Sequence, residues 1–545
     1  MSKDNIQQSE RSTSREKYLS RRRYLAAVGL AAGAGVLAGC EGGGDGTDTP
    51  EETTAPAATT VEAETTATEG ETTTGGTTTT KEGTTGKEGT TTEEGTTTEE
   101  ETTTEEGTTN TPDENEQALQ QSYPGLEILS PSPPNAQAAA RETYTSFITP
   151  REEHYIRNHY PAPEIERTEW TISLTGMVDE EVELTMEEVM NGFSTESVTH
   201  TMQCSGNGRS FFDPQVGGNQ WSFGAVGNTV WTGTPLSEVL DAYGADTSDG
   251  AWLSVMGGDA PEGEDIFTRS IPMSKVVDDC LLAYEMNGSP MTAEHGFPVR
   301  LLVPGWYGNN NVKWVRRMHV MDRMVFGEEW EEGDQRLYTH WQQYSYRIIP
   351  EQDEAAEQYE SIDLFDTYEQ MQSTDEIRNA YMYDQLVKSL IGYPGEGATV
   401  SPGIGGDIEV IGVAWAGDDG VETVEVSTNG GESFAEAEFF GPSGGPTSWR
   451  QFRYVWSEPE PGEHTLASRA TDGQGRAQPA TISSPDEGLR GITDDKYPWN
   501  KDGYGCTAYM PHAVTVTVEE QADTNATGST STATAAPTTA NNSSS

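Results

Sequence analysis

The stretch His200-Thr-Met-Gln-Cys-Ser-Gly-Asn-Gly-Arg-Ser-Phe-Phe212 places one cysteine, Cys204, between a strand-like run and a tight turn. Residues 197–203 predict a strand, and the Ser-Gly-Asn-Gly sequence predicts a turn before Arg209. A cysteine at such a strand end can serve as a metal ligand or as a nucleophile. The commoner alternative is a buried cysteine followed by an ordinary turn. The stretch alone leaves both open.

The charge balance of the 545-residue chain is strongly acidic. It has 90 acidic and 32 basic residues, which gives a formal net charge of −58. Such a surface disfavours binding to nucleic acid or to anionic lipid. Because the acidic excess is spread along the whole chain, it predicts a halophilic protein, for which concentrated salt screens the self-repulsion.

Residues 1–40 have the pattern of an export signal. Ser20-Arg-Arg-Arg-Tyr-Leu25 precedes an apolar run, residues 26–38, that is too short to span a bilayer. This pattern predicts a twin-arginine signal, whose route carries folded proteins. Leu37-Ala-Gly-Cys40 resembles a lipobox. We expect lipidation at Cys40 and an extracytoplasmic protein anchored on the outer face of the cell membrane; an unlipidated cleavage site is the alternative.

Two segments have compositions that cannot form a core. Residues 41–116 are Thr, Glu and Gly with almost no large apolar residue, and residues 521–545 are rich in Thr, Ala, Asn and Ser. Nothing in them offsets the entropy of ordering the chain, so both are predicted to be disordered. Threonine glycosylation of the first segment and the sequons at Asn525 and Asn542 are further hypotheses.

Residues 117–393 and 394–520 predict two domains of different class. In the first, an alternating run at 170–176 predicts a strand and Thr185-Met-Glu-Glu188 a capped helix, which together favour an irregular α+β domain. In the second, the alternating runs 407–415, 421–427 and 452–456 predict an antiparallel β-sandwich of immunoglobulin type. A sandwich of this kind carries no functional information by itself.

The chain has four cysteines, too few for a disulfide scaffold of this size. Cys280 precedes an apolar run and is expected in the core, and its pairing with Cys506 stays open. The sequence contains no Cys-x-x-Cys-His haem motif.

Several motifs, taken together and in order, resemble the sulfite oxidase family of molybdenum enzymes, in particular bacterial and archaeal sulfite dehydrogenases and sulfane dehydrogenase catalytic subunits. The resemblance covers about residues 153–518. Besides the Cys204 stretch, the motifs are Tyr155-Ile-Arg-Asn-His-Tyr-Pro161, Leu281-Leu-Ala-Tyr-Glu-Met-Asn-Gly288, His295-Gly-Phe-Pro-Val-Arg300 and Pro304-Gly-Trp-Tyr-Gly-Asn-Asn-Asn-Val-Lys-Trp314. The sandwich is similar to the family's dimerisation domain, which implies a homodimer.

The resemblance implies one molybdenum held by one molybdopterin and by the thiolate of Cys204, since soft sulfur ligands suit this metal. The predicted contacts to the pterin and its phosphate are Asn158, His159, His295, Arg300, Val312 and Lys313. The alternatives are a turn before a strand for His295 and Arg300, and a surface charge for Lys313.

The resemblance also implies a substrate site for a small oxyanion, predicted to contain Arg157, Arg209, Arg490 and Tyr346. Surface ion pairs are the alternative for each arginine. Gly208 departs from the animal and plant pattern, which has a second arginine there, and this weakens inferences from those enzymes.

We therefore expect an exported oxidoreductase that oxidises sulfite or a related reduced-sulfur anion by oxygen-atom transfer. Its acceptor would be a c-type cytochrome or a blue-copper protein. Within the same class, the alternative is a reductase of nitrate or of a sulfoxide. The alternative from another class is a non-catalytic cell-surface lipoprotein or adhesin.

Overall fold

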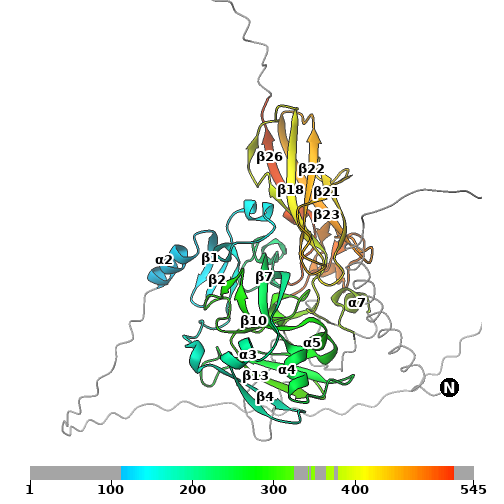
Figure 1. Ribbon diagram of the computed structural model, residues 1–545. Coiled ribbons are helices and arrows are strands. Elements are labelled where there is room, and N and C mark those ends of the chain that lie inside the picture. The colour runs from blue at the N-terminus through cyan, green and yellow to red at the C-terminus, as the bar shows by residue number, and fades with distance from the viewer. Residues whose placement is uncertain (1–111, 325–341, 343–344, 350–363, 374–378, 521–545) are drawn as a thin grey trace, which may run out of the picture. The chain divides into compact units, whose positions relative to one another are not determined.

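The computed structural model describes residues 112–324, 342, 345–349, 364–373 and 379–520 (Figure 1). The predicted signal, nearly all of the predicted linker and the predicted tail lie outside these ranges. Among the described helices, none combines the length and the apolar character that crossing a membrane would require.

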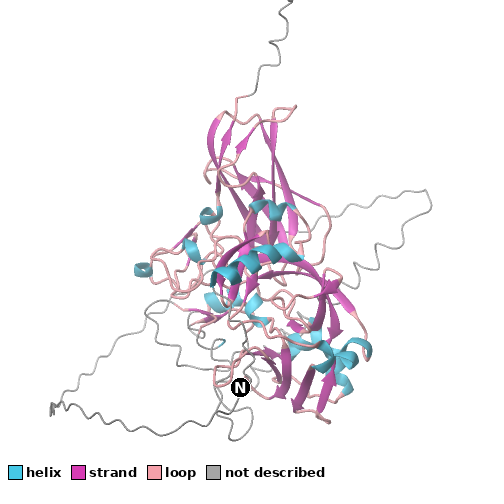
Figure 2. Cartoon of the chain, turned by 90° about the vertical axis from the view of Figure 1, so that its left-hand side faces the viewer, coloured by secondary structure: helices cyan, strands magenta, loops and turns pink. Residues whose placement is uncertain are grey.

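Strands dominate the described residues, and the α-helices are short (Figure 2). The helices are α2 (Pro112–Ser122), α3 (Met186–Asn191), α4 (Leu236–Ala242), α5 (Met273–Asp279) and α7 (Thr367–Gln372). Single turns of 3-10 helix cover Arg141–Thr145, Arg151–Glu153, Arg167–Glu169, Arg209–Phe211, Gly308–Asn310, Pro485–Glu487 and Met510–His512. This mixture agrees with the α+β class predicted for the first domain.

Two five-stranded sheets form the centre of the first part of the chain. One has the order β11 (Ser289–Pro290), β10 (Leu281–Met286), β7 (Val226–Pro235), β6 (Glu196–Gln203), with β12 (Arg300–Leu302) also paired to β10. The other has the order β5 (Val182–Thr185), β4 (Thr171–Gly176), β13 (Val315–Met321), β8 (Trp252–Gly257), β9 (Thr268–Pro272). Their apolar faces share one buried core.

The local sequence explains why α3 and α4 begin where they do. The Thr185 side chain accepts a hydrogen bond from the Glu188 backbone N–H, and the Glu188 carboxylate accepts from the Thr185 backbone, which completes the predicted capping box. Pro235 precedes α4, where a missing N–H costs nothing. The predicted strand that ends at Gln203 is confirmed as β6.

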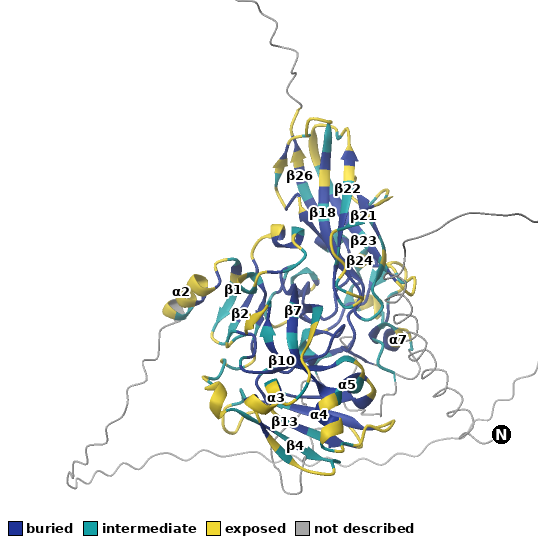
Figure 3. Ribbon diagram, in the orientation of Figure 1, coloured by how far each residue is buried: buried dark blue, intermediate teal, exposed yellow. Residues whose placement is uncertain are grey.

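Smaller elements flank this core. A three-stranded sheet, β1 (Leu126–Pro131), β2 (Pro134–Ala138) and β3 (Ile156–Arg157), packs with α2 on its own apolar cluster. Most of α2 is exposed, and Leu119 is the buried residue through which it contacts the sheet (Figure 3). β14 (Arg347–Ile348) pairs with β15 (Ala380–Tyr381), and β24 (Thr481–Ile482) pairs with β25 (Lys496–Tyr497).

The C-terminal part contains two sheets that share a core. One has the order β16 (Lys388–Tyr393), β18 (Asp407–Trp415), β22 (Arg450–Ser457), β21 (Glu438–Phe440). The other has the order β17 (Thr399–Val400), β26 (Val514–Val518), β23 (Gly462–Asp472), β19 (Val421–Ser427), β20 (Ala435–Glu436). The runs predicted at 407–415 and 421–427 are confirmed as β18 and β19. The immunoglobulin type and the predicted domain boundaries stay predictions.

Buried clusters join the two parts of the chain. One contains Val226 of β7 together with Leu390 of β16 and Trp415 of β18. Another contains Phe212 together with Tyr497 and Cys506. The segment 497–508 therefore packs against the residues that follow the Cys204 turn. Cys280 and Cys506 are buried in different clusters and both are unpaired, so the disulfide left open by the sequence does not form in this structure.

Arg476 links the two parts electrostatically, which gives a test of the packing. Its guanidinium lies 2.9 Å from Asp366 and 2.6 Å from Asp472, and it also contacts Asp419, whose side chain is 6% exposed. We expect Arg476→Gln to lower the free energy of unfolding by about 3 kcal/mol, because it leaves buried carboxylates without a counter-charge.

The matched control is Arg453→Gln, since Arg453 is 41% exposed and its carboxylate partners lie 3.4–3.5 Å away. It should cost less than about 1 kcal/mol. Denaturant unfolding in molar salt measures both, and equal losses would contradict a special role for Arg476.

Candidate active site

Strand β6 brings Cys204 to the wall of a cavity of about 70 Å³ that opens to solvent. Seven of the predicted site residues line it: Arg157, His159, Cys204, His295, Arg300, Lys313 and Tyr346. They come from segments spread over nearly two hundred residues of sequence. The fold therefore collects most of the predicted set in one place.

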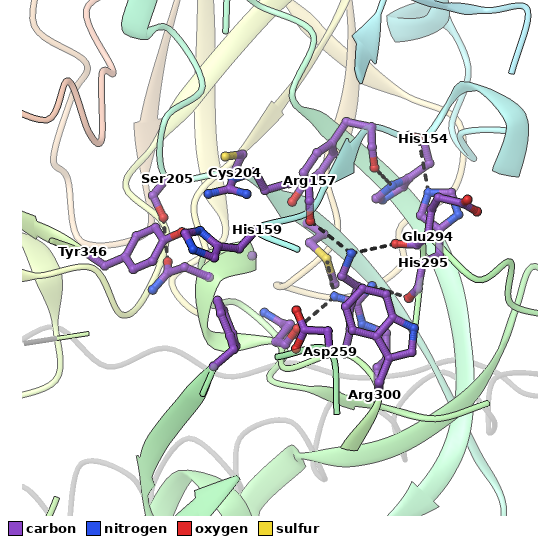
Figure 4. A pocket seen from close by; sticks show the side chains of 18 residues that line it. His154, Arg157, His159, Cys204, Ser205, Asp259, Glu294, His295, Arg300 and Tyr346 are labelled. Atoms are coloured by element: carbon purple, nitrogen blue, oxygen red, sulfur yellow. Dashed lines mark hydrogen bonds between the residues drawn. The ribbon is translucent and has the colours of Figure 1, made fainter. Parts of the chain in front are cut away.

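Two ends of the cavity can be distinguished in Figure 4. We name them the Tyr346 end and the His295 end. The Tyr346 end contains Arg157, His159, Cys204 and Tyr346. The His295 end contains Glu294, His295, Arg300 and Lys313, whose ammonium group donates to the Glu294 carbonyl at 2.7 Å.

The backbone around Cys204 is held by hydrogen bonds on both sides. The Cys204 N–H donates to the Ala225 carbonyl at 2.9 Å, and the Asn207 N–H closes the predicted turn on the Cys204 carbonyl at 3.0 Å. Burial raises the pKa of the Cys204 thiol, while Arg157 and Arg209 act in the opposite direction. Cys204 is 8% exposed and lines the cavity, as a metal ligand must.

Gly208 has a structural reason for its identity. Its φ is +99°, and a Cβ there would lie 3.0 Å from the Cys506 Cβ and 3.3 Å from the His512 Nε2. Neither the backbone conformation nor the space accommodates a side chain. The absence of an arginine at this position is thus tied to the close approach of the C-terminal segment.

Buried positive charges dominate the His295 end. Arg300 is 4% exposed and donates to the carbonyls of His295 at 2.9 Å and Asn311 at 3.1 Å. Lys313 donates to the Arg157 carbonyl at 3.0 Å and to the Asn158 side chain. Burial lowers the pKa of Lys313 well below its usual range, and Arg300 adds to this, because two cations disfavour each other.

The histidines of the cavity are neutral near pH 7. Burial lowers the pKa of His154 to about 3 and that of His295 well below its usual range. His295 Nε2 lies 3.3 Å from the His154 carbonyl, which can only accept, so Nε2 carries the proton. Burial, with Arg157 and Arg269, lowers the pKa of His159 to about 4. These side chains can donate or accept hydrogen bonds without adding charge.

Four of the predicted site residues do not line the cavity. Asn158 is buried behind Lys313. Val312 is fully buried in the first core, and its carbonyl accepts from the Leu301 N–H. Arg209 donates to the carbonyls of Asp502 at 2.8 Å and Asn219 at 3.1 Å. Arg490 is half-buried in the loop after the turn Pro485–Glu487. Their functional roles stay predictions.

Sequence reasoning missed other residues at the cavity, notably His154, Asp259 and Glu294. Asp259 follows a Gly-Gly pair at the end of an apolar run, which is a signal for backbone close to a ligand. Arg269 was also missed. It is fully buried in β9, whose sequence Thr-Arg-Ser-Ile-Pro carries no signal of that burial.

The donor set fits a molybdopterin. Arg300 and Lys313 place positive charge beside the cavity, which favours a phosphate there. Asn158 Nδ2, His154 Nε2 and Arg300 Nε are buried and have no partner within the described residues, so the heteroatoms of a pterin ring can satisfy them. The Cys204 thiol supplies a soft ligand for the metal. His154, Cys204, Arg300 and Lys313 line the cavity, and Asn158 lies next to it, bonded to Lys313.

Comparisons with known proteins also indicate a molybdopterin site. Residues 159–329 match the family model described as oxidoreductase molybdopterin binding domain, and residues 379–497 match the Mo-co oxidoreductase dimerisation domain. The chain is 30% identical to sulfite oxidase of Gallus gallus over 384 residues, which covers 68% of this chain and 76% of that protein. It is 31% identical to mitochondrial sulfite oxidase of Rattus norvegicus over 388 residues, 69% of this chain and 65% of that protein.

A shorter match and a solved structure complete the comparison. A nitrate reductase [NADH] of Brassica napus is 36% identical over 189 residues, 33% of this chain and 21% of that protein. The sulfane dehydrogenase SoxCD from Paracoccus pantotrophus aligns with a TM-score of 0.53 and 24% identity, over 78% of this chain and 96% of that chain, which shows a shared fold. The chain belongs to the sulfite oxidase family of molybdopterin-dependent oxidoreductases, and its cofactor is molybdenum-molybdopterin.

Proposed function

We propose that this enzyme oxidises sulfite or a related reduced-sulfur anion and passes the electrons to a separate redox protein. The observation that carries the proposal is the positive charge of the cavity. Within the described residues, Arg157, Arg300 and Lys313 form no ion pair with a carboxylate, although the chain has 90 acidic residues. Such charges are arranged for anions that are not part of the chain.

One end of the cavity binds the cofactor phosphate, and the other end binds the substrate. When bound, the molybdenum-molybdopterin supplies oxygen-atom transfer and two-electron redox chemistry. Arg300 and Lys313 hold its phosphate at the His295 end. At the Tyr346 end, Arg157 attracts and orients a small oxyanion next to the Cys204 thiolate. The Tyr346 hydroxyl and the neutral His159 imidazole supply hydrogen bonds that fix the orientation of the anion.

Reduction of nitrate is the second candidate function, favoured by the similarity to nitrate reductase. Both substrates are small oxyanions, so the positive charge of the Tyr346 end suits either one. The sulfite oxidases match over 65–76% of their length and the nitrate reductase over 21%. This difference in coverage supports sulfite as the first choice.

We also propose the context in which the enzyme works. The twin-arginine pattern and Cys40 support export and a lipid anchor, and the acidic excess supports a halophilic host. The dimerisation-domain match supports a homodimer formed through the sandwich. An exported c-type cytochrome or blue-copper protein would accept the electrons.

Purified protein from a host with full cofactor supply should contain about one molybdenum per chain and oxidise sulfite with an artificial electron acceptor. Cys204→Ser should abolish turnover, because a serine alkoxide is a harder ligand for the metal. Metal analysis and steady-state assays with sulfite, and with nitrate plus an electron donor, measure this. Turnover of nitrate without turnover of sulfite would replace the first candidate by the second.

Arg300→Gln should lower the molybdenum and pterin content of the purified protein several-fold, because it removes the fixed charge opposite the phosphate. Its matched control is Arg316→Gln, an exposed arginine whose Cζ lies 4.8 Å from the centre of the Trp170 ring, outside the cavity. Cofactor content, checked alongside circular dichroism, separates cofactor loss from misfolding. Full cofactor content in Arg300→Gln would show that Arg300 does not hold the cofactor.

Light scattering tests the homodimer. In molar salt we expect twice the mass of one chain, because the sandwich matches a dimerisation domain. A monomer under these conditions would contradict the proposal. Low salt is no test of a chain with a net charge of −58, since self-repulsion opposes assembly there.

A further inference from the structure

Arg269 is a charged residue at a position that normally holds an apolar one. It lies in β9 and is 0% exposed, as is its neighbour Ile271. Its Nε donates to the Asn309 carbonyl at 2.8 Å and its Nη1 to the Thr268 carbonyl at 2.7 Å. Its Nη2 is buried without a partner among the described residues. Within these residues, no carboxylate forms an ion pair with Arg269.

The contacts of Arg269 lead to the Tyr346 end of the cavity. Its guanidinium carbon lies 4.8 Å from the centre of the Tyr346 ring and 3.9 Å from that of Phe267, so two rings that line the cavity flank it. The Asn309 side chain accepts a hydrogen bond from the Ser205 hydroxyl at 2.6 Å. Because Ser205 follows Cys204, Arg269 is linked through Asn309 to the residue next to the thiol.

Arg269 does not itself line the cavity, so it acts on a bound anion through its charge and through the residues that it holds. In a buried environment the effective dielectric constant is low. The charge of Arg269, one residue away from the cavity surface, therefore still interacts with an anion bound in the cavity. The electrostatic effect of Arg269 on a cavity residue is visible in the lowered pKa of His159. Burial contributes most to it, followed by Arg157 and Arg269.

We propose that Arg269 is a positioning residue that sets the anion affinity and the charge preference of the Tyr346 end. It holds Tyr346 and Asn309 in place, and its charge, which forms no ion pair within the described part of the chain, adds to that of Arg157. This inference rests on the proposed function in taking the ligand to be a small oxyanion. Its consequence is a preference for dianions over monoanions, since the interaction energy with Arg269 scales with the charge of the ligand.

A purely structural role makes a different prediction. If Arg269 only connected β9 to the Asn309 turn, its side chain would need hydrogen-bond donors and volume but no net charge. Glutamine keeps donors and removes the charge, whereas lysine keeps the charge and loses the planar stacking. The pair therefore separates charge from shape.

The experiment measures the binding of sulfate and of nitrate to the purified holoenzyme by calorimetry, at constant ionic strength in molar chloride. The proteins are the wild type, Arg269→Gln, Arg269→Lys and the control Arg316→Gln, each with its molybdenum content determined. For Arg269→Gln we expect affinity to fall about tenfold for sulfate and about threefold for nitrate, with molybdenum content unchanged. The control should match the wild type.

Arg269→Lys tests the role of the charge without Arg269→Gln, because its charge can be removed by raising the pH. Burial lowers the pKa of a lysine, so this variant should bind sulfate about as well as the wild type near pH 7 and lose affinity as pH rises. The wild type should change less over the same range, because a guanidinium stays charged. If Arg269→Gln does not fold, this difference in pH dependence carries the test.

Three results would overturn the inference: no sulfate binding by the wild type, equal sulfate affinity in the wild type and Arg269→Gln, or equal weakening in the Gln and Lys variants at every pH. Sulfite turnover by the wild type is measured separately. If the wild type binds sulfate but does not oxidise sulfite, the proposed function fails while the role of Arg269 is still tested.

Discussion

The ammonium group of Lys388 joins the Cys204 turn to the segment that contains Cys506. It is fully buried at the start of β16, and it donates to the carbonyls of Asn207 at 3.1 Å and Cys506 at 2.8 Å. Burial lowers its pKa to about 8, while Cys506 acts in the opposite direction. The Gly505 N–H adds a bond to the Ser205 carbonyl at 2.8 Å. Through these contacts the sandwich fixes the loop that carries the candidate metal ligand.

Arg476, Arg157 and Arg300 show two different environments for an arginine in this acidic chain. Arg476 is surrounded by Asp366, Asp419 and Asp472, where its charge is fully compensated and its role is to join the two parts of the chain. Arg157 and Arg300 contact carbonyl groups and lack carboxylate partners among the residues described. The first arrangement is typical of a structural ion pair, whereas the second leaves a positive potential for a ligand.

The sequence predicted best what depends on local pattern. The strand before Cys204, the capping box at Thr185 and the alternating runs of β18 and β19 are local signals, and the structure confirms them. Seven of the predicted site residues line one cavity, and all of them except Tyr346 lie in motifs that resemble those of a known family in order and spacing. Residues with no such motif, such as Asp259 and Arg269, were missed, because their roles follow from tertiary packing of β8 and β9 against the cavity.

The position of Arg209 shows what spacing along the chain does not decide. It lies five residues after Cys204, close enough to suggest the same cavity, yet its guanidinium is bonded to the carbonyls of Asp502 and Asn219. It packs 5.0 Å from the centre of the Tyr504 ring, which in turn stacks on Tyr346 with ring centres 5.3 Å apart. Tyr504 comes from the C-terminal segment. The Tyr346 end of the cavity is therefore complete only when that segment is packed in place, which couples retention of a functional site to the stability of the sandwich.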